Sequence, residues 1–458
     1  MSVNYLEIAG YRGFATSQKL VLAKPDGTNE GSGLTFLLGA NNSGKSAFLE
    51  ALKFFAGNGN PELSRSQRNT KNHQRIELKL NFQNNLEAIL KTVNAGGSST
   101  QTTWPENNNR PRIFYLPSRR FFRHEVGKSS TSRDEVMHNL SGKGRDNQPL
   151  DYFHGKLFSL LQNPAKLQDY NNLLSEVLGY ELKWTIEKES NHFIQYEIDN
   201  ISHTSEGAGD GIINLMIIAD AIYESAPNDT IIIDEPEVSL HPSAQKRLYS
   251  VLKRIAKDVQ VILATHSPYF VDFEAIAQGA NAARFYKEGE EIRIAALPSE
   301  TKRKIDGIIR NARNPHVLGA NAKEIFFVSD NVLLVEGQDD VMCIEKASKS
   351  LNIPINGNIF GWGVGGENNM PFFVGLLKDF GYKKVVGVLD RNATVITSLQ
   401  RDFPEFIFYQ ISTDDIRDKN QENAKAGKTG LFTTGCDLKP ESNTELQTLL
   451  NNINQSFN

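Results

Sequence analysis

The chain has 458 residues, of which 39% are hydrophobic and 23% are charged. This composition is typical of a globular protein, and the length predicts two or three domains rather than one core. The formal net charge of -4 excludes a surface that is basic all over, so any contact with DNA must use local patches.

Two features bear on the compartment. No stretch approaches the ~20 apolar residues that span a membrane, and the N-terminal MSVNYLEIAGYRGF lacks the basic start and apolar segment of a secretory signal. The two cysteines, Cys343 and Cys436, are far apart in the sequence and form no CxxC pair, which argues against a disulfide scaffold or a zinc site. We expect a cytoplasmic protein without a membrane partner.

Apolar periodicity predicts strands that alternate with helices. Residues 3–39 contain three short strands, and the next predicted elements are a helix over 46–57, strands over 75–82 and 192–199, a helix over 211–226, and buried strands over 230–234 and 259–265. This alternation indicates an α/β fold with a largely parallel sheet. The Gly/Ser/Thr/Asn-rich residues 94–108 are expected to form an exposed loop. Basic residues recur over 65–79 and 110–123 and form candidate DNA-binding patches.

GANNSGKS, Gly39 to Ser46, fits the P-loop pattern GxxxxGK[ST] and lies between an apolar strand and a helix. Backbone N–H groups of such a loop and the N-terminus of the helix attract polyphosphate. Lys45 is expected to reach the β- and γ-phosphates of ATP, and Ser46 to ligate Mg²⁺. The predicted ATP-binding residues of this loop are Asn41, Asn42, Ser43, Gly44, Lys45 and Ser46.

Two later strands end in polar residues that suit the same site. IIIDEPE places Asp234 as a magnesium ligand and Glu235 as the group that polarises the attacking water. ILATHSP places His266 where it could hydrogen-bond the γ-phosphate.

Two other segments leave alternatives open. HTSEGAGDG places Ser205 and Gly207 before a helix, where they could present donors to a phosphate or form an ordinary helix cap. Arg119 and Arg120 could sense phosphate or DNA, or be plain surface arginines.

The order of P-loop, signature-like loop, acidic strand and switch histidine resembles the ABC-type ATPase head of DNA-repair and chromosome-maintenance proteins and of the OLD family. The resemblance implies that Ser205 and Gly207 act in trans, on ATP held by the other subunit of a homodimer. TSEGA stands where such heads carry LSGGQ, and Glu206 adds a negative charge. Residues 125–200 leave room only for a modest insertion, which is a candidate dimerisation element.

A second alternation of strands and helices begins at residue 331. One apolar strand ends in Glu336-Gly337, a glycine-rich turn covers 361–369, and another apolar strand ends at Asp390. Phosphodiester cleavage commonly uses Mg²⁺ or Mn²⁺, and these hard cations prefer carboxylate oxygens. We expect Glu336 and Asp390 to hold one ion, and Asp340, one helical turn after Glu336, to help a second.

Asn392 stands where a two-metal site would prefer a carboxylate. Its carbonyl oxygen can ligate Mg²⁺ but contributes no charge. The segment DDIRD, with Asp414, Asp415 and Asp418, could supply the missing carboxylate or could be a solvated helix end.

This strand, turn and strand pattern over roughly 331–420 resembles the Toprim domain of topoisomerases, primases and OLD-family nucleases. The resemblance implies that Lys428 stabilises developing phosphate charge, with Lys425 as a rival for that role. No tyrosine-nucleophile domain or zinc module of a topoisomerase or primase is evident in the sequence.

The predicted architecture is therefore an ABC-type P-loop ATPase head over 1–295, a linker over 296–330 and a smaller Rossmann-like Toprim domain over 331–458. This combination resembles the OLD family. It implies an ATP-hydrolysing, Mg²⁺- or Mn²⁺-dependent DNA endonuclease, nicking or cleaving, in bacterial antiphage defence. The implied partners are DNA, further copies of the chain in a homodimer or higher oligomer, and a co-encoded helicase-like or reverse-transcriptase protein.

The expected catalytic residues are Glu235, His266, Glu336, Asp390 and Lys428, and the expected metal ligands are Ser46, Asp234, Glu336, Asp340, Asp390 and Asn392. The alternative is an ATPase sensor or scaffold whose Toprim domain binds nucleic acid or a partner without cutting it.

Overall fold

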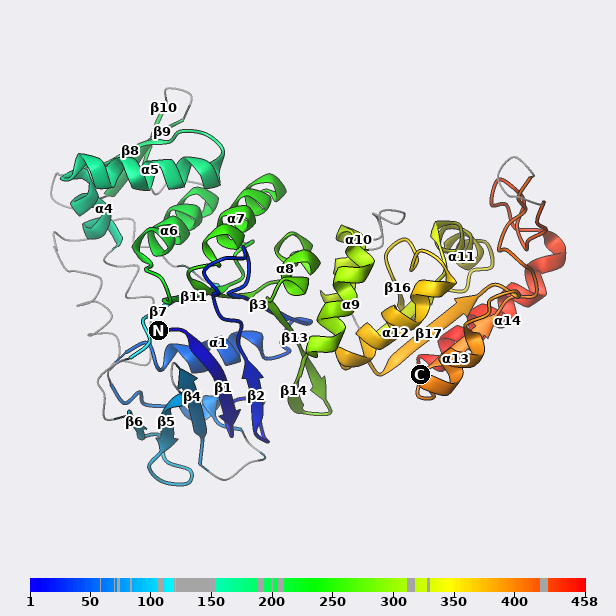
Figure 1. Ribbon diagram of the computed structural model, residues 1–458, viewed down its shortest axis with the longest axis horizontal. Helices are drawn as coiled ribbons and strands as arrows, with labels where there is room; N and C mark the ends of the chain where they lie inside the picture. The colour runs from blue at the N-terminus through cyan, green and yellow to red at the C-terminus, as the bar shows by residue number, and fades with distance from the viewer. Residues whose placement is uncertain are drawn as a thin grey trace. The chain divides into compact units, whose positions relative to one another are not determined.

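The computed structural model divides the chain into two compact units, Met1–Ile294 and Ala295–Asn458 (Figure 1). The residues that the structure describes are 1–57, 59–69, 71, 75–82, 85–105, 110–118, 120, 153–187, 193–198, 201–204, 210–310, 318–327, 330–420 and 427–458. Ser205, Gly207, Arg119 and Lys425 lie outside these ranges. No helix within the described ranges is long and apolar enough to cross a membrane.

The first unit contains an antiparallel sheet in the order β2-β1-β4-β5-β6. Its strands are β1 (Val3–Ala9), β2 (Gln18–Val21), β4 (Glu77–Phe82), β5 (Leu86–Thr92) and β6 (Thr100–Thr103). The expectation of an exposed loop over 94–108 is wrong at β6. The β-branched threonines of β6 pair with β5 instead, because they suit an edge strand.

The central sheet of this unit has the order β14-β13-β3-β12-β11-β7. Its strands are β3 (Leu34–Leu38), β7 (Ile113–Leu116), β11 (Thr230–Asp234), β12 (Gln260–Ala264), β13 (Asn281–Glu288) and β14 (Glu291–Ala296). The pairs among β7, β11, β12, β3 and β13 are parallel. Strands β3, β11 and β12 are buried along their whole length, as expected for parallel strands covered on both faces.

Helix α1 (Lys45–Lys53) contacts β1 of one sheet and β11 and β12 of the other. Its residues Phe48, Leu49 and Leu52 share one buried cluster with both sheets. Helices α6 (Asp210–Glu224), α7 (Pro242–Ile255) and α8 (Phe273–Ala277) lie on the side of the central sheet opposite α1 (Figure 1). The P-loop helix is thus held between two layers.

The expected insertion is described from residue 153 onward. It contains α4 (Phe153–Leu161), α5 (Pro164–Leu178) and an antiparallel sheet of β8 (Lys183–Glu187), β9 (Phe193–Ile198) and β10 (Ile201–Thr204). Helix α5 packs on α6 and α7. The role of the 125–200 insertion in dimerisation stays a prediction.

The second unit contains a parallel sheet in the order β16-β15-β17-β18. Its strands are β15 (Asn331–Val335), β16 (Asn358–Ile359), β17 (Lys384–Leu389) and β18 (Ile407–Gln410), and its longer helices are α11 (Gln338–Ser350), α12 (Met370–Asp379), α13 (Ile396–Asp402) and α14 (Asn443–Ser456). Helices α11 and α14 share a buried cluster with β15 and β17. Cys343 and Cys436, distant in the sequence, meet in this cluster as buried free thiols.

The stretch 296–330 differs from the expected linker. It contains α9 (Ser299–Ile309) and α10 (Ala320–Glu324), and it belongs to the second unit. Helix α9 packs on α12, where the Thr301 hydroxyl donates a hydrogen bond to the Asp379 carboxylate, and the Tyr382 hydroxyl donates to the carbonyl of Ile325 at 2.7 Å. The basic composition was misleading because α9 is amphipathic, with Thr301 and Ile305 buried and Arg303 and Lys304 exposed.

We predict that Phe48→Ala destabilises the first unit. Phe48 is fully buried between the two sheets and packs edge-on against Phe285, so its truncation should lower the free energy of unfolding by about 3–5 kcal/mol. Denaturant unfolding would measure this, with the exposed Ile201→Ala as a control that should change little. A loss as small as that of the control would contradict the packing of α1 between the sheets.

Candidate functional site

The P-loop connects β3 to α1 with a backbone that only glycine suits at two points. Gly39 has a φ of 130°, and a Cβ there would lie 2.2 Å from the carbonyl oxygen of Phe285. Gly44, with a φ of 105°, precedes the first residue of α1. Asn41 and Asn42 are exposed in the loop, and their role in ATP binding stays a prediction.

Lys45 is buried at the start of α1. Its ammonium group donates to the carbonyls of Gly39 at 2.8 Å and Ala40 at 3.0 Å, and it lies 3.0 Å from Nε2 of His266. Burial lowers the pKa of Lys45 to about 8. Burial and the Lys45 charge lower the pKa of His266 to about 4, so His266 is a neutral acceptor for the lysine at neutral pH.

Asp234 ends β11 and lies against the first turn of α1. The Ser46 hydroxyl hydrogen-bonds its carboxylate, and burial raises the pKa of Asp234 to about 6. The other oxygen, Oδ1, is buried and has no hydrogen-bond partner among the described residues, and the same holds for the Ser43 hydroxyl. A hydroxyl beside a carboxylate with an unpartnered oxygen is a donor set that fits Mg²⁺, so Ser46 and Asp234 suit a nucleotide-bound magnesium ion.

Glu235 follows directly in a left-handed backbone conformation, with a φ of 51°. Its N–H donates to the carbonyl of Ala264 at 2.7 Å, which ties it to the end of β12. The structure thus brings Lys45, Asp234, Glu235 and His266 to one edge of the central sheet.

Two residues complete this site that were not assigned to it from the sequence. Arg120 is buried, and its guanidinium donates to the carbonyls of Asp234 and Glu235. Arg120 is therefore not a plain surface arginine, and its role as a sensor of phosphate or DNA stays a prediction. The Glu237 carboxylate accepts hydrogen bonds from the Thr265 hydroxyl and from the N–H of His266. The second glutamate of the DEPE segment was the only available signal for Glu237. The burial of Arg120 itself had no signal in the sequence.

Some of the basic residues in the candidate DNA patches pair within the chain. Lys79 lies 3.2 Å from Glu77 and 3.7 Å from Glu7, and Arg112 lies 3.2 Å from Asp229. Such pairing reduces the positive charge that these two stretches offer to a phosphate backbone.

In the second unit, Glu336 follows β15 and Asp390 follows β17, and these strands are parallel neighbours. Their carboxyl ends therefore meet, and Oε1 of Glu336 accepts the N–H of Asp390 at 2.8 Å. Asp340 lies in the first turn of α11, where Oδ2 accepts the N–H of Gly337 at 2.8 Å. Oδ1 of Asp390 is buried without a hydrogen-bond partner in the described part of the chain.

These three carboxyl groups disfavour one another's ionisation. Burial, and next the Asp390 charge, raise the pKa of Asp340 to about 8. Burial, and next the Glu336 charge, raise the pKa of Asp390 to about 7. Burial also raises the pKa of Glu336. A divalent cation would relieve both the desolvation and the repulsion.

The DDIRD segment contributes one carboxylate to this group, Asp415. It is buried, and its charge is felt by Glu336, Asp340 and Asp390. Asp414 pairs instead with Arg391, and Asp418 with Lys439.

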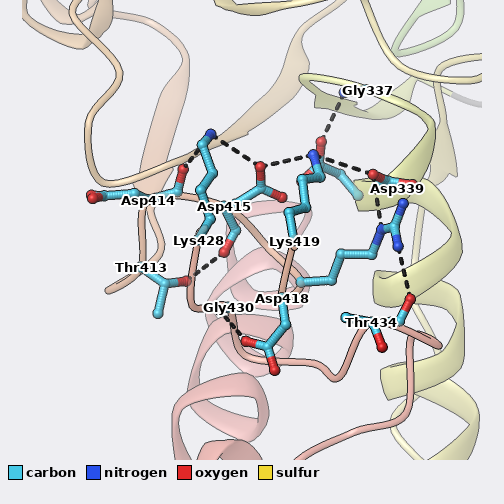
Figure 2. A network of polar contacts seen from close by, with 12 residues as sticks. Gly337, Asp339, Thr413, Asp414, Asp415, Asp418, Lys419, Lys428, Gly430 and Thr434 are labelled. Atoms are coloured by element: carbon cyan, nitrogen blue, oxygen red, sulfur yellow. Dashed lines mark hydrogen bonds and ion pairs between the residues drawn. The ribbon is translucent and has the colours of Figure 1, made fainter. Parts of the chain in front are cut away.

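Figure 2 shows Lys419 and Lys428 reaching Asp415 from two sides. Their ammonium groups lie 2.8 Å and 3.1 Å from Oδ2 of Asp415, and Lys419 also lies 3.3 Å from Asp339. Burial alone would raise the pKa of Asp415, but hydrogen bonds from the two lysines hold it below its ordinary value. Lys428 and Lys419 thus both lie at Asp415, and the expected role of Lys428 toward a phosphate stays a prediction.

The donor types fit Mg²⁺ or Mn²⁺, but the carboxylates are not preassembled. Among the described residues, no three His, Cys, Asp or Glu side chains converge as a metal-binding group. One oxygen of Glu336 and one of Asp340 accept hydrogen bonds from backbone N–H groups, which leaves the other oxygen of each carboxylate for a metal. Asn392 is exposed in the turn after β17, and the buried Asp415 is better placed than Asn392 to add the missing charge.

Comparisons with known proteins agree with both units. Residues 34–272 match the family model "AAA domain, putative AbiEii toxin, Type IV TA system", and residues 326–391 match "Overcoming lysogenization defect protein-like, TOPRIM domain". The OLD nuclease of Thermus scotoductus is 31% identical over 159 residues, which are 32% of this chain and 28% of that protein. The match thus spans little more than a quarter of the relative's length.

Solved structures of SMC heads are also similar. The SMC head bound to the C-terminal winged-helix domain of ScpA is 14% identical with a TM-score of 0.47, covering 66% of this chain and all of that one. The SMC head domain from Thermotoga maritima is 16% identical with a TM-score of 0.38, covering 65% and all of that chain. The family assignment depends on the sequence matches: this chain belongs to the AAA-domain family of the first model, and an OLD-like Toprim domain follows that AAA domain.

Proposed function

We propose that this protein is an ATP-binding and ATP-hydrolysing, metal-dependent DNA endonuclease of OLD type. The observation that carries the proposal is the group of half-buried carboxylates at the ends of β15 and β17 and at the start of α11, with raised pKa values and a buried, unpartnered oxygen on Asp390. This group lies in an OLD-like Toprim domain behind a P-loop ATPase.

At the head, Lys45 would exchange its contacts with the loop carbonyls for the phosphates of ATP. Ser46 and Asp234 would hold Mg²⁺, which neutralises phosphate charge when bound. Glu235 would orient and polarise the attacking water, and His266 would contact the γ-phosphate. The guanidinium of Arg120 holds the backbone at Asp234 and Glu235 through hydrogen bonds to their carbonyls.

At the Toprim site, Glu336, Asp340 and Asp390 would hold Mg²⁺ or Mn²⁺, with Asp415 as the added carboxylate. Such an ion activates water and neutralises the phosphate under attack. Lys428 would leave Asp415 and donate to the developing phosphate charge. Asn392 remains a candidate ligand through its amide oxygen.

Three further proposals rest on the resemblance to the OLD family. The chain would act as a homodimer or higher oligomer, in which Ser205 and Gly207 close over the ATP of a partner. It would cut DNA in antiphage defence. A co-encoded helicase-like or reverse-transcriptase protein would be its partner.

A second function is favoured by one observation, the absence of a converged ligand set among the described residues. Two lysines already neutralise the Asp415 carboxylate. A site that never binds a metal would need the same neutralisation of its negative charge. The rival is therefore an ATPase sensor whose Toprim domain binds nucleic acid without cutting it.

We expect purified protein to nick or linearise plasmid DNA with Mg²⁺ or Mn²⁺, and Glu336→Ala to abolish this cleavage because it removes a carboxylate from the proposed ligands. Lys45→Ala, assayed with and without ATP, would show whether ATP activates or restrains cleavage. If the wild-type protein hydrolyses ATP and binds DNA but does not cleave it with Mg²⁺ or Mn²⁺, the nuclease proposal is contradicted. That result would establish the ATPase sensor instead.

Metal binding at the Toprim site should depend on pH. Asp390 and Asp340, with pKa values of about 7 and 8, are protonated at low pH and must lose their protons to bind a cation. Mn²⁺ affinity should therefore rise about tenfold or more between about pH 6 and pH 8.5.

Calorimetric titration without nucleotide would measure this affinity, in an Asp234→Asn background that removes the metal ligand of the head. Asp390→Asn should weaken binding and flatten the pH dependence. An affinity that stays constant across this range would show that these carboxyl groups are not the ligands.

Two head variants should separate ATP binding from hydrolysis. Lys45→Ala removes the predicted phosphate contact and should weaken ATP binding about tenfold or more. Glu235→Gln should keep ATP binding but slow hydrolysis by about 10²-fold or more, because an amide cannot accept the proton of water. Nucleotide binding and phosphate release would be measured for both, and normal hydrolysis in Glu235→Gln would exclude it as the base.

A further inference from the structure

The chain has three tryptophans, and Trp362 is the one that is exposed. Trp104 packs on Phe55, and Trp184 packs on Tyr170. The side chain of Trp362 is 45% exposed and lies in the glycine-rich turn after β16. Nothing in the chemistry proposed above uses it.

The turn that carries Trp362 has a defined backbone. The N–H of Gly363 donates to the carbonyl of Phe360 at 3.0 Å, which closes a four-residue turn with Gly361 and Trp362 at its corners. Gly361 has a φ of 52°, a conformation that favours glycine at the first corner. The N–H of Phe360 donates to the carbonyl of Leu333 in β15 at 2.9 Å. The indole therefore projects from a rigid corner.

The far side of this turn is fixed to the backbone of the candidate metal site. The N–H of Val364 donates to the carbonyl of Val335 at 2.9 Å, and the N–H of Gly366 donates to the carbonyl of Glu336 at 2.8 Å. Gly363 packs so closely that a Cβ on it would lie 2.7 Å from the Cα of Gly337. Trp362 therefore directly precedes Gly363, the residue that packs against Gly337.

We propose that the Trp362 indole stacks on an unpaired nucleobase of a DNA strand whose backbone reaches the Toprim carboxylates. The position of that backbone rests on the proposed function. Stacking of a base on an aromatic side chain is strong enough to change the affinity for a strand about tenfold. The faces of paired bases are covered in a duplex, so the stack selects single-stranded or locally melted DNA. A pre-fixed indole loses little conformational entropy on binding.

The setting of Trp362 favours a base over a protein partner. Its neighbours in the turn are glycines, followed by Glu367, Asn368 and Asn369. Asn369 and Glu367 are engaged in holding the turn: Asn369 donates to the carbonyls of Val364 and Gly365, and Glu367 accepts from Thr394. A lone aromatic ring in a polar turn suits a base, whereas protein interfaces use an apolar centre.

The test measures DNA binding in EDTA, so that cleavage does not interfere. The probes are a short single-stranded oligodeoxynucleotide, an abasic strand of the same length and charge, and the matching duplex. Trp362→Ala should weaken binding of the base-bearing strand about tenfold and leave the abasic strand and the duplex unchanged. Trp362→Phe should retain most of the affinity. Ile407→Ala, with 42% exposure, is the control for lost apolar surface.

Tryptophan fluorescence gives a second readout. The base-bearing strand should quench the wild-type protein, and this quenching should be lost in Trp362→Phe. Absent quenching, or an equal effect of Trp362→Ala on base-bearing and abasic strands, overturns the stack. A changed oligomeric mass in Trp362→Ala with unchanged DNA binding also overturns it, in favour of a protein interface.

These outcomes are separate from those of the proposed function. Quenching by single strands in a protein that never cuts would support the stack and contradict the nuclease. Cleavage that depends on Glu336, without any quenching, would support the nuclease and contradict the stack. Unchanged thermal unfolding of Trp362→Ala would show that the turn still folds.

Discussion

Buried negative charge at the carboxyl ends of parallel strands is the constraint on which both units depend. Asp234 is the last residue of β11, and Asp390 directly follows β17. Each keeps one buried oxygen without a hydrogen-bond partner within the described ranges. A buried carboxylate is costly unless it is paired, and both respond in the same way, with a pKa above its ordinary value. Binding of a cation would therefore stabilise the ionised carboxylate at each site.

Lysines lie beside both sites. Lys45 binds the carbonyls of its own loop and faces a neutral His266. Lys419 and Lys428 share one oxygen of Asp415. Binding of a phosphate at either site would then be an exchange of partners by a lysine that is already in place. Such an exchange loses less free energy than the desolvation of a free ammonium group.

Rigid glycine turns place the remaining groups. The P-loop needs glycine at Gly39 because the carbonyl of Phe285 leaves no room for a side chain. The turn at 361–366 is fixed to β15 and to Glu336 by backbone hydrogen bonds. In the second unit, these hydrogen bonds tie the segment that carries Trp362 to the backbone next to Glu336.

Local patterns in the sequence determined much of this protein. The P-loop and the apolar strands ending at Asp234, Glu336 and Asp390 were evident because each depends on neighbouring residues alone, and the family matches agree with the fold that they predict. Only the tertiary structure decided which member of DDIRD faces the site, because Asp414, Asp415 and Asp418 differ in the cations that surround them.

The tertiary structure alone also decided three other features. They are the burial of Arg120, the contact of Cys343 with Cys436, and the inclusion of 296–330 in the second unit. Each of these depends on contacts between segments that are distant in the sequence, which no local pattern of charge or hydropathy encodes.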